Sequence, residues 1–115
     1  MIFEKLNNLI NKLNIDYKKV IIAGARNEFY RPVNLALNLV SRNIDRETSE
    51  KKLFINRKKH TDEFSNNLND FAKKNNFKFL DLYQIACNSE LKKCDFYDDN
   101  YNLYYYDYGH WTKEG

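Results

Sequence analysis

The chain has 115 residues and a mass of 13.9 kDa, which suits one small domain with a thin core. Its 19 basic and 16 acidic residues are interspersed and give a net charge of +3, which argues against a dedicated nucleic-acid-binding protein. The longest apolar run, residues 20–25, is far shorter than the roughly 20 residues that cross a bilayer, and the N-terminus lacks the pattern of a signal peptide.

The first predicted elements are a helix and a strand. Apolar residues recur at helical spacing over 2–14, and a continuous apolar run at 20–24 follows after a short polar turn. A strand that is apolar on both faces suits the interior of a parallel sheet. Residues 25–32 then form a loop at the carboxyl end of this strand, where open α/β sheets usually bind their ligands.

Two helices separated by a polar segment are predicted in the middle of the chain. Residues 33–40 fit a short helix, and residues 41–52, which are polar and charged, predict an exposed loop. Helical spacing returns over 56–75, and Asn75 and Asn76 end this helix because asparagine tolerates the left-handed conformation. His60 falls on the apolar side of this helix, where we expect a packed or partly exposed residue rather than a ligand.

A second strand is predicted at 77–82, so the order helix, strand, helix, strand favours a parallel sheet flanked by helices. The fold class is therefore α/β. Two parallel strands are too few to be stable alone, which indicates that further structure completes the sheet.

Cys87 and Cys94 have six residues between them and form no CxxC motif, so they do not predict a metal site. In an oxidising compartment this spacing suits a short disulfide loop. In a reducing compartment the pair would be two small buried thiols. The spacing alone leaves both interpretations open.

The last third of the chain combines acidic residues with tyrosines. The acidic residues lack the spacing of a calcium-binding loop and predict a solvated loop (Asp95, Asp98 and Asp99). The tyrosines fit either a sugar-binding surface or the packing of a final strand (Tyr97, Tyr101, Tyr104, Tyr105, Tyr106 and Tyr108).

The stretch 107–115 (DYGHWTKEG) carries the strongest chemical signal. Because Asp107 lies three residues before His110, its carboxylate can accept a hydrogen bond from one imidazole nitrogen. The other nitrogen is then free to take a proton from a hydroxyl group. The same spacing also occurs in surface turns that have no catalytic role.

This stretch resembles the last block of SGNH (GDSL-type) hydrolases and acyltransferases, Asp-x-x-His-(apolar)-(Ser/Thr)-x-x-Gly. Residues 18–32 resemble that family's fourth strand and its Pro-containing loop, and residues 56–81 its next helix and strand. The run from Asp81 through both cysteines to His110 is similar to the C-terminal SGNH domain of OafA-type membrane O-acyltransferases. The resemblance covers nearly the whole chain and implies part of a three-layer, flavodoxin-like SGNH fold.

The resemblance implies a Ser-His-Asp mechanism in which Asp107 orients the base His110. The Gly-Asp-Ser block that carries the family's nucleophile does not occur in this sequence. We therefore expect residues 1–115 to be the C-terminal portion of a single SGNH domain, without the nucleophile-bearing half and inactive alone. Asn27 fits the loop after the fourth strand better than the family's oxyanion motif, so we leave it out of the catalytic residues.

The resemblance also implies partners and a location. The partners would be an acyl donor, a saccharide acceptor on the cell surface, the upstream SGNH half and a membrane acyltransferase domain, with no metal, cofactor or nucleic acid. A Cys87–Cys94 disulfide would fit the periplasmic face of a bacterial inner membrane. The alternative function is a non-catalytic glycan-binding or interaction module built around Tyr104 and Tyr106.

Overall fold

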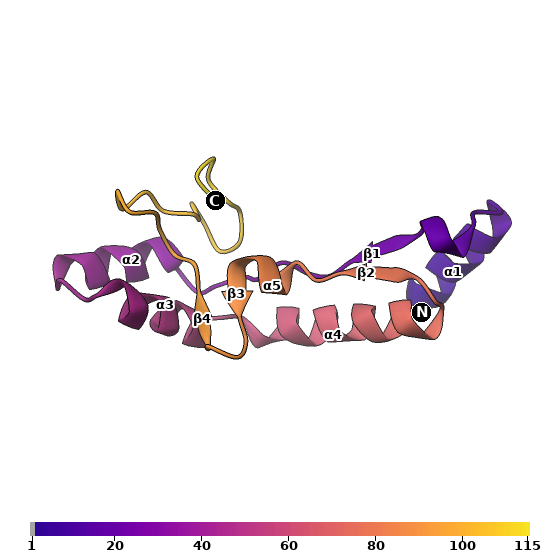
Figure 1. Cartoon of the computed structure of the whole chain (residues 1–115), viewed down its shortest axis with the longest axis horizontal. Helices are drawn as coiled ribbons and strands as arrows, with labels where there is room; N and C mark the ends of the chain where they lie inside the picture. The colour runs from indigo at the N-terminus through magenta and orange to yellow at the C-terminus, as the bar shows by residue number, and fades with distance from the viewer. Residues whose placement is uncertain (1) are drawn as a thin grey trace.

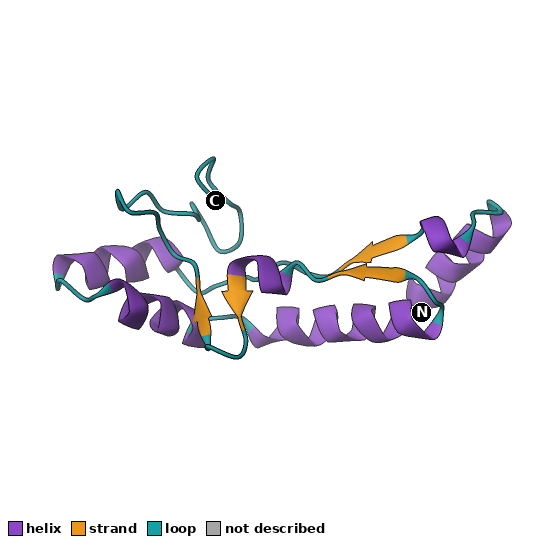
Figure 2. Ribbon diagram, viewed as in Figure 1, coloured by secondary structure: helices purple, strands orange, loops and turns teal. Residues whose placement is uncertain are grey.

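The computed structural model describes residues 2–115 and combines helices with short strands (Figures 1 and 2). The predicted helices and the two predicted strands are confirmed, with bounds that differ by up to three residues at each end. In chain order the elements are α1 (Ile2–Lys12), a 3-10 turn η1 (Tyr17–Lys19), β1 (Ile21–Ala23), α2 (Pro32–Ser41), α3 (Arg46–Ile55), α4 (Lys59–Lys74), β2 (Lys78–Leu80), α5 (Tyr83–Ala86), β3 (Cys87–Asn88) and β4 (Lys93–Cys94).

Strands β1 and β2 pair in parallel, as the order of elements predicts, with Ile22 opposite Phe79. Both side chains face helices α1 and α4, where Ile10, Ala72 and Phe77 complete a small hydrophobic core. Helix α4 ends as predicted, because Asn76 adopts the left-handed conformation, with φ of 58°. This part of the molecule therefore has one layer of helices packed on a short parallel sheet.

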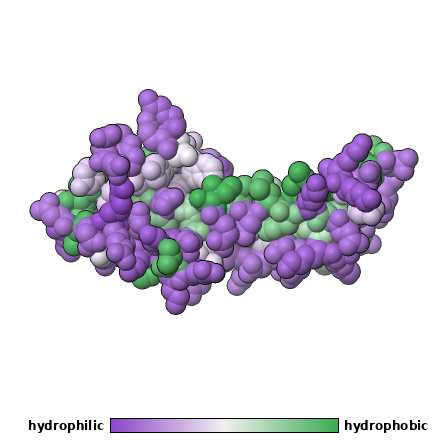
Figure 3. Space-filling model, in the orientation of Figure 1, coloured by the Kyte–Doolittle hydropathy of each residue, from purple (hydrophilic) through white to green (hydrophobic). Residues whose placement is uncertain are grey.

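The opposite face of the sheet is open to solvent. Ile21 of β1 is 61% exposed and Leu80 of β2 is 47% exposed. The prediction that the first strand is buried on both faces is therefore wrong for residues 2–115 taken alone. The space-filling view shows hydrophobic surface along this part of the molecule (Figure 3). A two-layer arrangement leaves apolar strand surface that a third layer would cover.

A second, larger core lies at the other end of the elongated molecule, around α2 and α3 (Figure 1). Its most completely buried side chains are Phe29, Phe96 and Leu53, together with both cysteines. The 16-residue helix α4 runs from this end to the parallel sheet. The chain thus has two hydrophobic cores, one between the parallel sheet and its helices and one around the disulfide.

The segment 41–52 is largely helical, so the prediction of an exposed loop is wrong. Helix α3 begins after Asp45, whose carboxylate accepts a hydrogen bond of 2.8 Å from the backbone N–H of Thr48. The buried residues of this helix are Ser49 and Leu53. A buried stripe this narrow, with one polar member, gives no hydrophobic periodicity that could reveal the helix in the sequence.

A disulfide joins Cys87 and Cys94, which lie opposite each other in the antiparallel pair β3–β4. Of the two interpretations of these cysteines, the structure contains the disulfide. Closing a loop of about eight residues restricts the unfolded chain by roughly 2.5 kcal/mol on the loop-entropy model. The cross-link therefore stabilises a core that is small for its surface.

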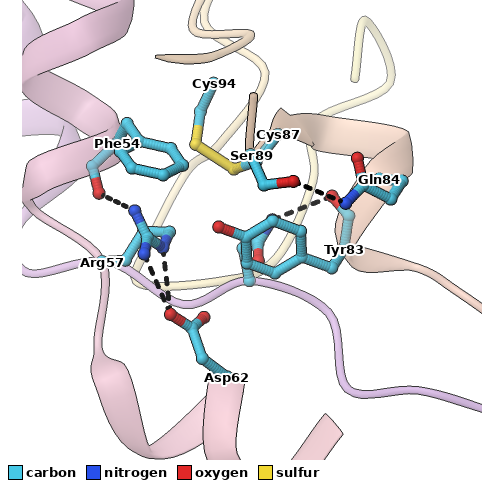
Figure 4. Close-up of a disulfide and its surroundings, with 9 residues drawn as sticks. Phe54, Arg57, Asp62, Tyr83, Gln84, Cys87, Ser89 and Cys94 are labelled. Atoms are coloured by element: carbon cyan, nitrogen blue, oxygen red, sulfur yellow. Dashed lines mark hydrogen bonds and ion pairs between the residues drawn. A yellow bond between two sulfur atoms is a disulfide. The ribbon is translucent and has the colours of Figure 1, made fainter. Parts of the chain in front are cut away.

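Arg57 connects α3, α4 and the region of the disulfide (Figure 4). Its guanidinium lies 3.6 Å from the centroid of the Phe54 ring and donates a hydrogen bond to the Phe54 carbonyl. It also forms an ion pair of 3.0 Å with Asp62 in the first turn of α4. These contacts fix residues 56–58, which connect the two helices and support the site described next.

Candidate functional site

The end of the chain folds into a hairpin whose turn holds Asp107 and His110. Tyr105 and Trp111 form an antiparallel bridge across the hairpin. The backbone N–H of Tyr106 donates a hydrogen bond of 3.2 Å to the carbonyl of His110. The two sequence-predicted site residues thus lie at one tip, three positions apart.

The Asp107 carboxylate uses its two oxygens differently. Oδ1 accepts hydrogen bonds from the backbone N–H groups of Gly109 (3.0 Å) and His110 (2.8 Å), which shape the turn. Oδ2 lies 2.6 Å from Nδ1 of the His110 ring. The N–H of Gly109 and the imidazole of His110 together lower the pKa of Asp107 from 3.8 to about 2. The carboxylate is therefore ionised at neutral pH.

This geometry fixes the tautomer of neutral His110. An ionised carboxylate can only accept hydrogen bonds, so Nδ1 of the ring carries the hydrogen and Nε2 keeps its lone pair. The side chain of His110 is 39% exposed, which leaves the ring accessible. Tyr106 stacks on it with ring centroids 5.6 Å apart, and Tyr108 contacts it at 5.5 Å. Two aromatic rings and one carboxylate therefore hold the imidazole.

The hairpin rests on the loop that follows β1. The N–H of fully buried Phe29 donates a hydrogen bond of 2.6 Å to the carbonyl of Tyr108. A Cβ atom at Gly109 would lie 3.1 Å from Cγ of Glu28, so a larger residue here would have to displace the Glu28 side chain slightly. Phe29 also forms an antiparallel bridge with Arg57. The hairpin that carries the imidazole is thus anchored to residues 28 and 29 of the loop after β1.

The structure separates the other sequence candidates from this turn. His60 is exposed and lies 3.7 Å from Glu28, so its expected place on the apolar side of the helix is wrong. In the acidic loop, Asp98 accepts hydrogen bonds from the N–H groups of Asn100 and Asn102 and organises a turn. Within residues 2–115, no group of three His, Cys, Asp or Glu side chains is placed to hold a metal ion.

Some of the tyrosines pack in the larger core, and others lie on the surface. Tyr97 and Tyr105 are buried in the larger core, whereas Tyr101, Tyr106 and Tyr108 are exposed. Instead of a regular final strand, the segment contains isolated bridges. Both interpretations of the cluster therefore remain relevant, each for different members.

The serines are engaged away from His110. Ser41, Ser49 and Ser89 make hydrogen bonds with Asn38, Asp45 and Gln84 respectively. Ser65 lies against Gly24 beneath the sheet, where a Cβ on the glycine would be 2.6 Å from the serine Oγ. Among residues 2–115, these positions offer no serine hydrogen-bonded to the imidazole.

Asn27 has a structural role. Its side chain is almost completely buried, and Nδ2 donates a hydrogen bond of 3.3 Å to the carbonyl of Tyr83. An amide that is enclosed and directed at a backbone carbonyl is not presented to a substrate. The Oδ1 atom of the same side chain is buried and accepts no hydrogen bond from the described residues.

Sequence reasoning missed Lys58, which lies next to the site. Its ammonium is 4.5 Å from the centroid of the Tyr108 ring and 3.6 Å from Oε2 of Glu28. These three residues are separated by 30 and 50 positions in the chain. No local motif connects them, so only the fold reveals the cluster.

The lowered pKa of Asp107 gives a test of the hairpin. Because the folded pKa, about 2, lies below the unfolded value of about 3.9, ionisation of Asp107 stabilises the hairpin above pH 4. This contribution is lost as the pH falls through about 2. We expect carbon-detected NMR of the Asp107 carboxyl group to give a titration midpoint near 2. A midpoint close to 4 in the folded chain would contradict the hydrogen bonds described above.

A carboxylate that orients an imidazole and leaves Nε2 free is the arrangement with which hydrolases and acyltransferases activate a hydroxyl group. Residues 2–115 match the family described as SGNH domain (fused to AT3 domains), and the chain belongs to this family. Membership indicates a function of the acyl-transfer or hydrolase type. Curated proteins and solved structures gave no match. Over residues 2–115, none of the helices has the length and hydrophobicity needed to span a membrane.

Proposed function

We propose that this chain supplies the general base of an SGNH O-acyltransferase or esterase of the OafA type, which transfers an acyl group, acetyl in the simplest case, to a saccharide hydroxyl. The observation that carries the proposal is the 2.6 Å contact between Asp107 and Nδ1 of His110, with Nε2 left free. Asp107 is the orienting residue and His110 the catalytic base.

In the transfer step, the acceptor hydroxyl gives its proton to Nε2 of His110 while its oxygen attacks the carbonyl carbon of an acyl-serine ester. The tetrahedral intermediate then expels the serine oxygen, which takes the proton back from Nε2. The acyl group has moved from serine to acceptor, and His110 is neutral again. With water as acceptor, the same step is ester hydrolysis.

The serine and the oxyanion donors come from a segment outside these 115 residues. This part of the proposal is supported by the serines of the chain, whose hydroxyl groups are engaged elsewhere. A base without nucleophile and oxyanion donors supplies little of the stabilisation that acyl transfer needs. We therefore place these residues in the C-terminal portion of a three-layer, flavodoxin-like SGNH domain, completed by a nucleophile-bearing N-terminal half.

The shape of the molecule supports a missing layer. Its radius of gyration is 17.1 Å, against about 13 Å for a compact domain of this length. Its accessible surface is 8085 Å², about 1,400 Å² more than expected for a folded monomer of this mass. An excess of this size matches one side of a stable interface. Exposed Ile21 and Leu80 mark the sheet face where that interface would lie.

The proposed setting is the periplasmic face of a bacterial inner membrane, next to the membrane acyltransferase domain that supplies the acyl group. The Cys87–Cys94 disulfide supports an oxidising compartment. The family description, which names fusion to AT3 domains, supports the membrane partner.

The proposal is tested by adding the Gly-Asp-Ser-bearing half of an SGNH domain from an AT3 fusion to the tagged 115-residue chain. We expect capture of the added half, and labelling of its serine by a fluorophosphonate probe only in the mixture. Ile21→Asp on the open sheet face should prevent capture. Ile55→Asp, at a residue that is 81% exposed at the end of α3, is the matched control and should not.

Two results would contradict the proposal. One is labelling of a serine in the 115-residue chain alone, because its own serines would then be sufficient. The other is capture that is equal for Ile21→Asp and the unchanged chain, because the open sheet face would then not be the interface.

A further inference from the structure

A shallow groove of about 590 Å³ lies beside the hairpin, between the start of α2 and the connection from α3 to α4. The residues that line it include Tyr30, Arg31 and Asn34 on one side and Lys58 and Tyr108 on the other. Among these described lining residues there are two cations and no carboxylate. The groove therefore combines aromatic rings, an amide and positive charge in one place.

Lys58 is held in position at this groove. Its ammonium lies 4.5 Å from the ring centroid of Tyr108 and 5.7 Å from that of Tyr30, while Glu28 contacts it at 3.6 Å. Its backbone N–H donates a hydrogen bond of 2.8 Å to the carbonyl of Glu28. A cation that is already ordered loses little side-chain entropy when it binds an anion.

Arg31 adds an unpaired cation. Within residues 2–115 its guanidinium makes no hydrogen bond or ion pair with a side chain or backbone group. Its backbone is left-handed, with φ of 44°. Arg31 is the N-cap residue of α2 and lies directly before Pro32. The free guanidinium can form a bidentate pair with a carboxylate, which gives both strength and orientation.

The groove is joined to the proposed base through one side chain. Tyr108, which forms one wall, contacts the His110 ring at 5.5 Å between centroids. The ring of Tyr108 therefore borders the groove and contacts the imidazole. The polar pocket between α4 and α5 is less suited to an anion, because it holds about 250 Å³ and is lined by Asp62 and Asp81.

We propose that this groove binds the acyl acceptor, and that the acceptor is a saccharide carrying a carboxylate, such as a uronic acid. This inference rests on the function proposed above. Arg31 and Lys58 pair with the carboxylate, and Tyr30 and Tyr108 lie against the C–H face of the sugar ring. The charge contacts fix the position of the ring, so that one of its hydroxyl groups faces Nε2 of His110.

The test is an NMR titration of the isotope-labelled 115-residue chain with trigalacturonate and with its methyl ester, which has the same rings without the charges. We expect shifts of the amide signals of Tyr30, Asn34 and Tyr108, with binding about tenfold weaker for the ester. Arg31→Gln should weaken binding of trigalacturonate about tenfold and leave binding of the ester unchanged. Arg42→Gln, at the other end of α2, removes the same charge and should change neither.

Three outcomes would overturn this inference: equal binding of the acid and the ester, shifts that map to the pocket between α4 and α5, or tighter binding of an oligodeoxythymidine at the same residues. If any of them occurs while acyl transfer by the assembled domain still requires His110, only the proposal that the groove binds the acceptor is wrong. If acyl transfer does not need His110, the groove is not an acceptor site even when it binds trigalacturonate.

Discussion

Replacing His110 with alanine is expected to lower acyl transfer by the assembled SGNH domain about 10²- to 10⁴-fold, because the acceptor hydroxyl loses the base that takes its proton. The fold should not change. The turn is shaped by Asp107 Oδ1 and the backbone N–H groups of residues 109 and 110, which alanine retains. Transfer of acetyl from p-nitrophenyl acetate to a saccharide measures the activity, and the Tm measures the fold.

His60 provides the matched control, since it is the second histidine of the chain and is more exposed than His110. His60→Ala should leave transfer within about twofold of the unchanged domain. Added imidazole should partly restore the His110→Ala variant, because a small base can enter the space that the side chain leaves. Full activity of His110→Ala would show that the site acts without this base and would favour the glycan-binding alternative.

Much of the fold could be predicted because its strongest elements follow simple periodicities. Helix α1 and helix α4 carry apolar residues at helical spacing, and strands β1 and β2 lie in short, mainly apolar runs bounded by polar turns. Helix α3 could not be predicted in this way. It is stabilised by the Asp45 cap and by a Glu47–Lys51 ion pair of 2.7 Å, and its buried residues Ser49 and Leu53 form no apolar stripe.

Part of the candidate site is formed by local contacts, and part is formed by contacts between segments far apart in the chain. Asp107 and His110 meet because they are three residues apart, so their hydrogen bond could be expected from the sequence. The contacts of Tyr108 with Phe29 and Lys58 join segments far apart in the chain, and no sequence pattern links either segment to Tyr108. The position of the hairpin and the groove beside it therefore depend on tertiary structure.

The one-sided burial of the first strand is informative for a different reason. The run 20–24 is apolar at positions that face the helices and at positions that face solvent. A sequence pattern is adapted to the environment of the complete fold, so a conflict between pattern and burial favours the proposal that another segment covers this face. Ile21 is the clearest case on this chain, and for this reason it carries the capture test.

Replacing Phe29 with alanine is expected to lower the free energy of unfolding by about 3–5 kcal/mol, the usual cost of deleting a fully buried aromatic side chain. Phe29 packs edge-on against Tyr105, with ring centroids 4.9 Å apart, and lies in the larger core. The loss should also loosen the hairpin, since the Phe29 backbone anchors Tyr108. Urea denaturation followed by circular dichroism measures the stability.

Phe64→Ala is the control, because this residue lies on α4 and is half exposed, so the same truncation should cost less than about 1 kcal/mol. If Phe29→Ala does not fold at 25 °C, Phe29→Leu keeps the prediction measurable with a loss on the order of 1–2 kcal/mol. In that variant the Nδ1 proton of His110 should exchange faster with solvent as the hairpin loosens. Equal stability losses for the two alanine variants would contradict this account, because the larger core would then not depend on the residue that joins it to the site.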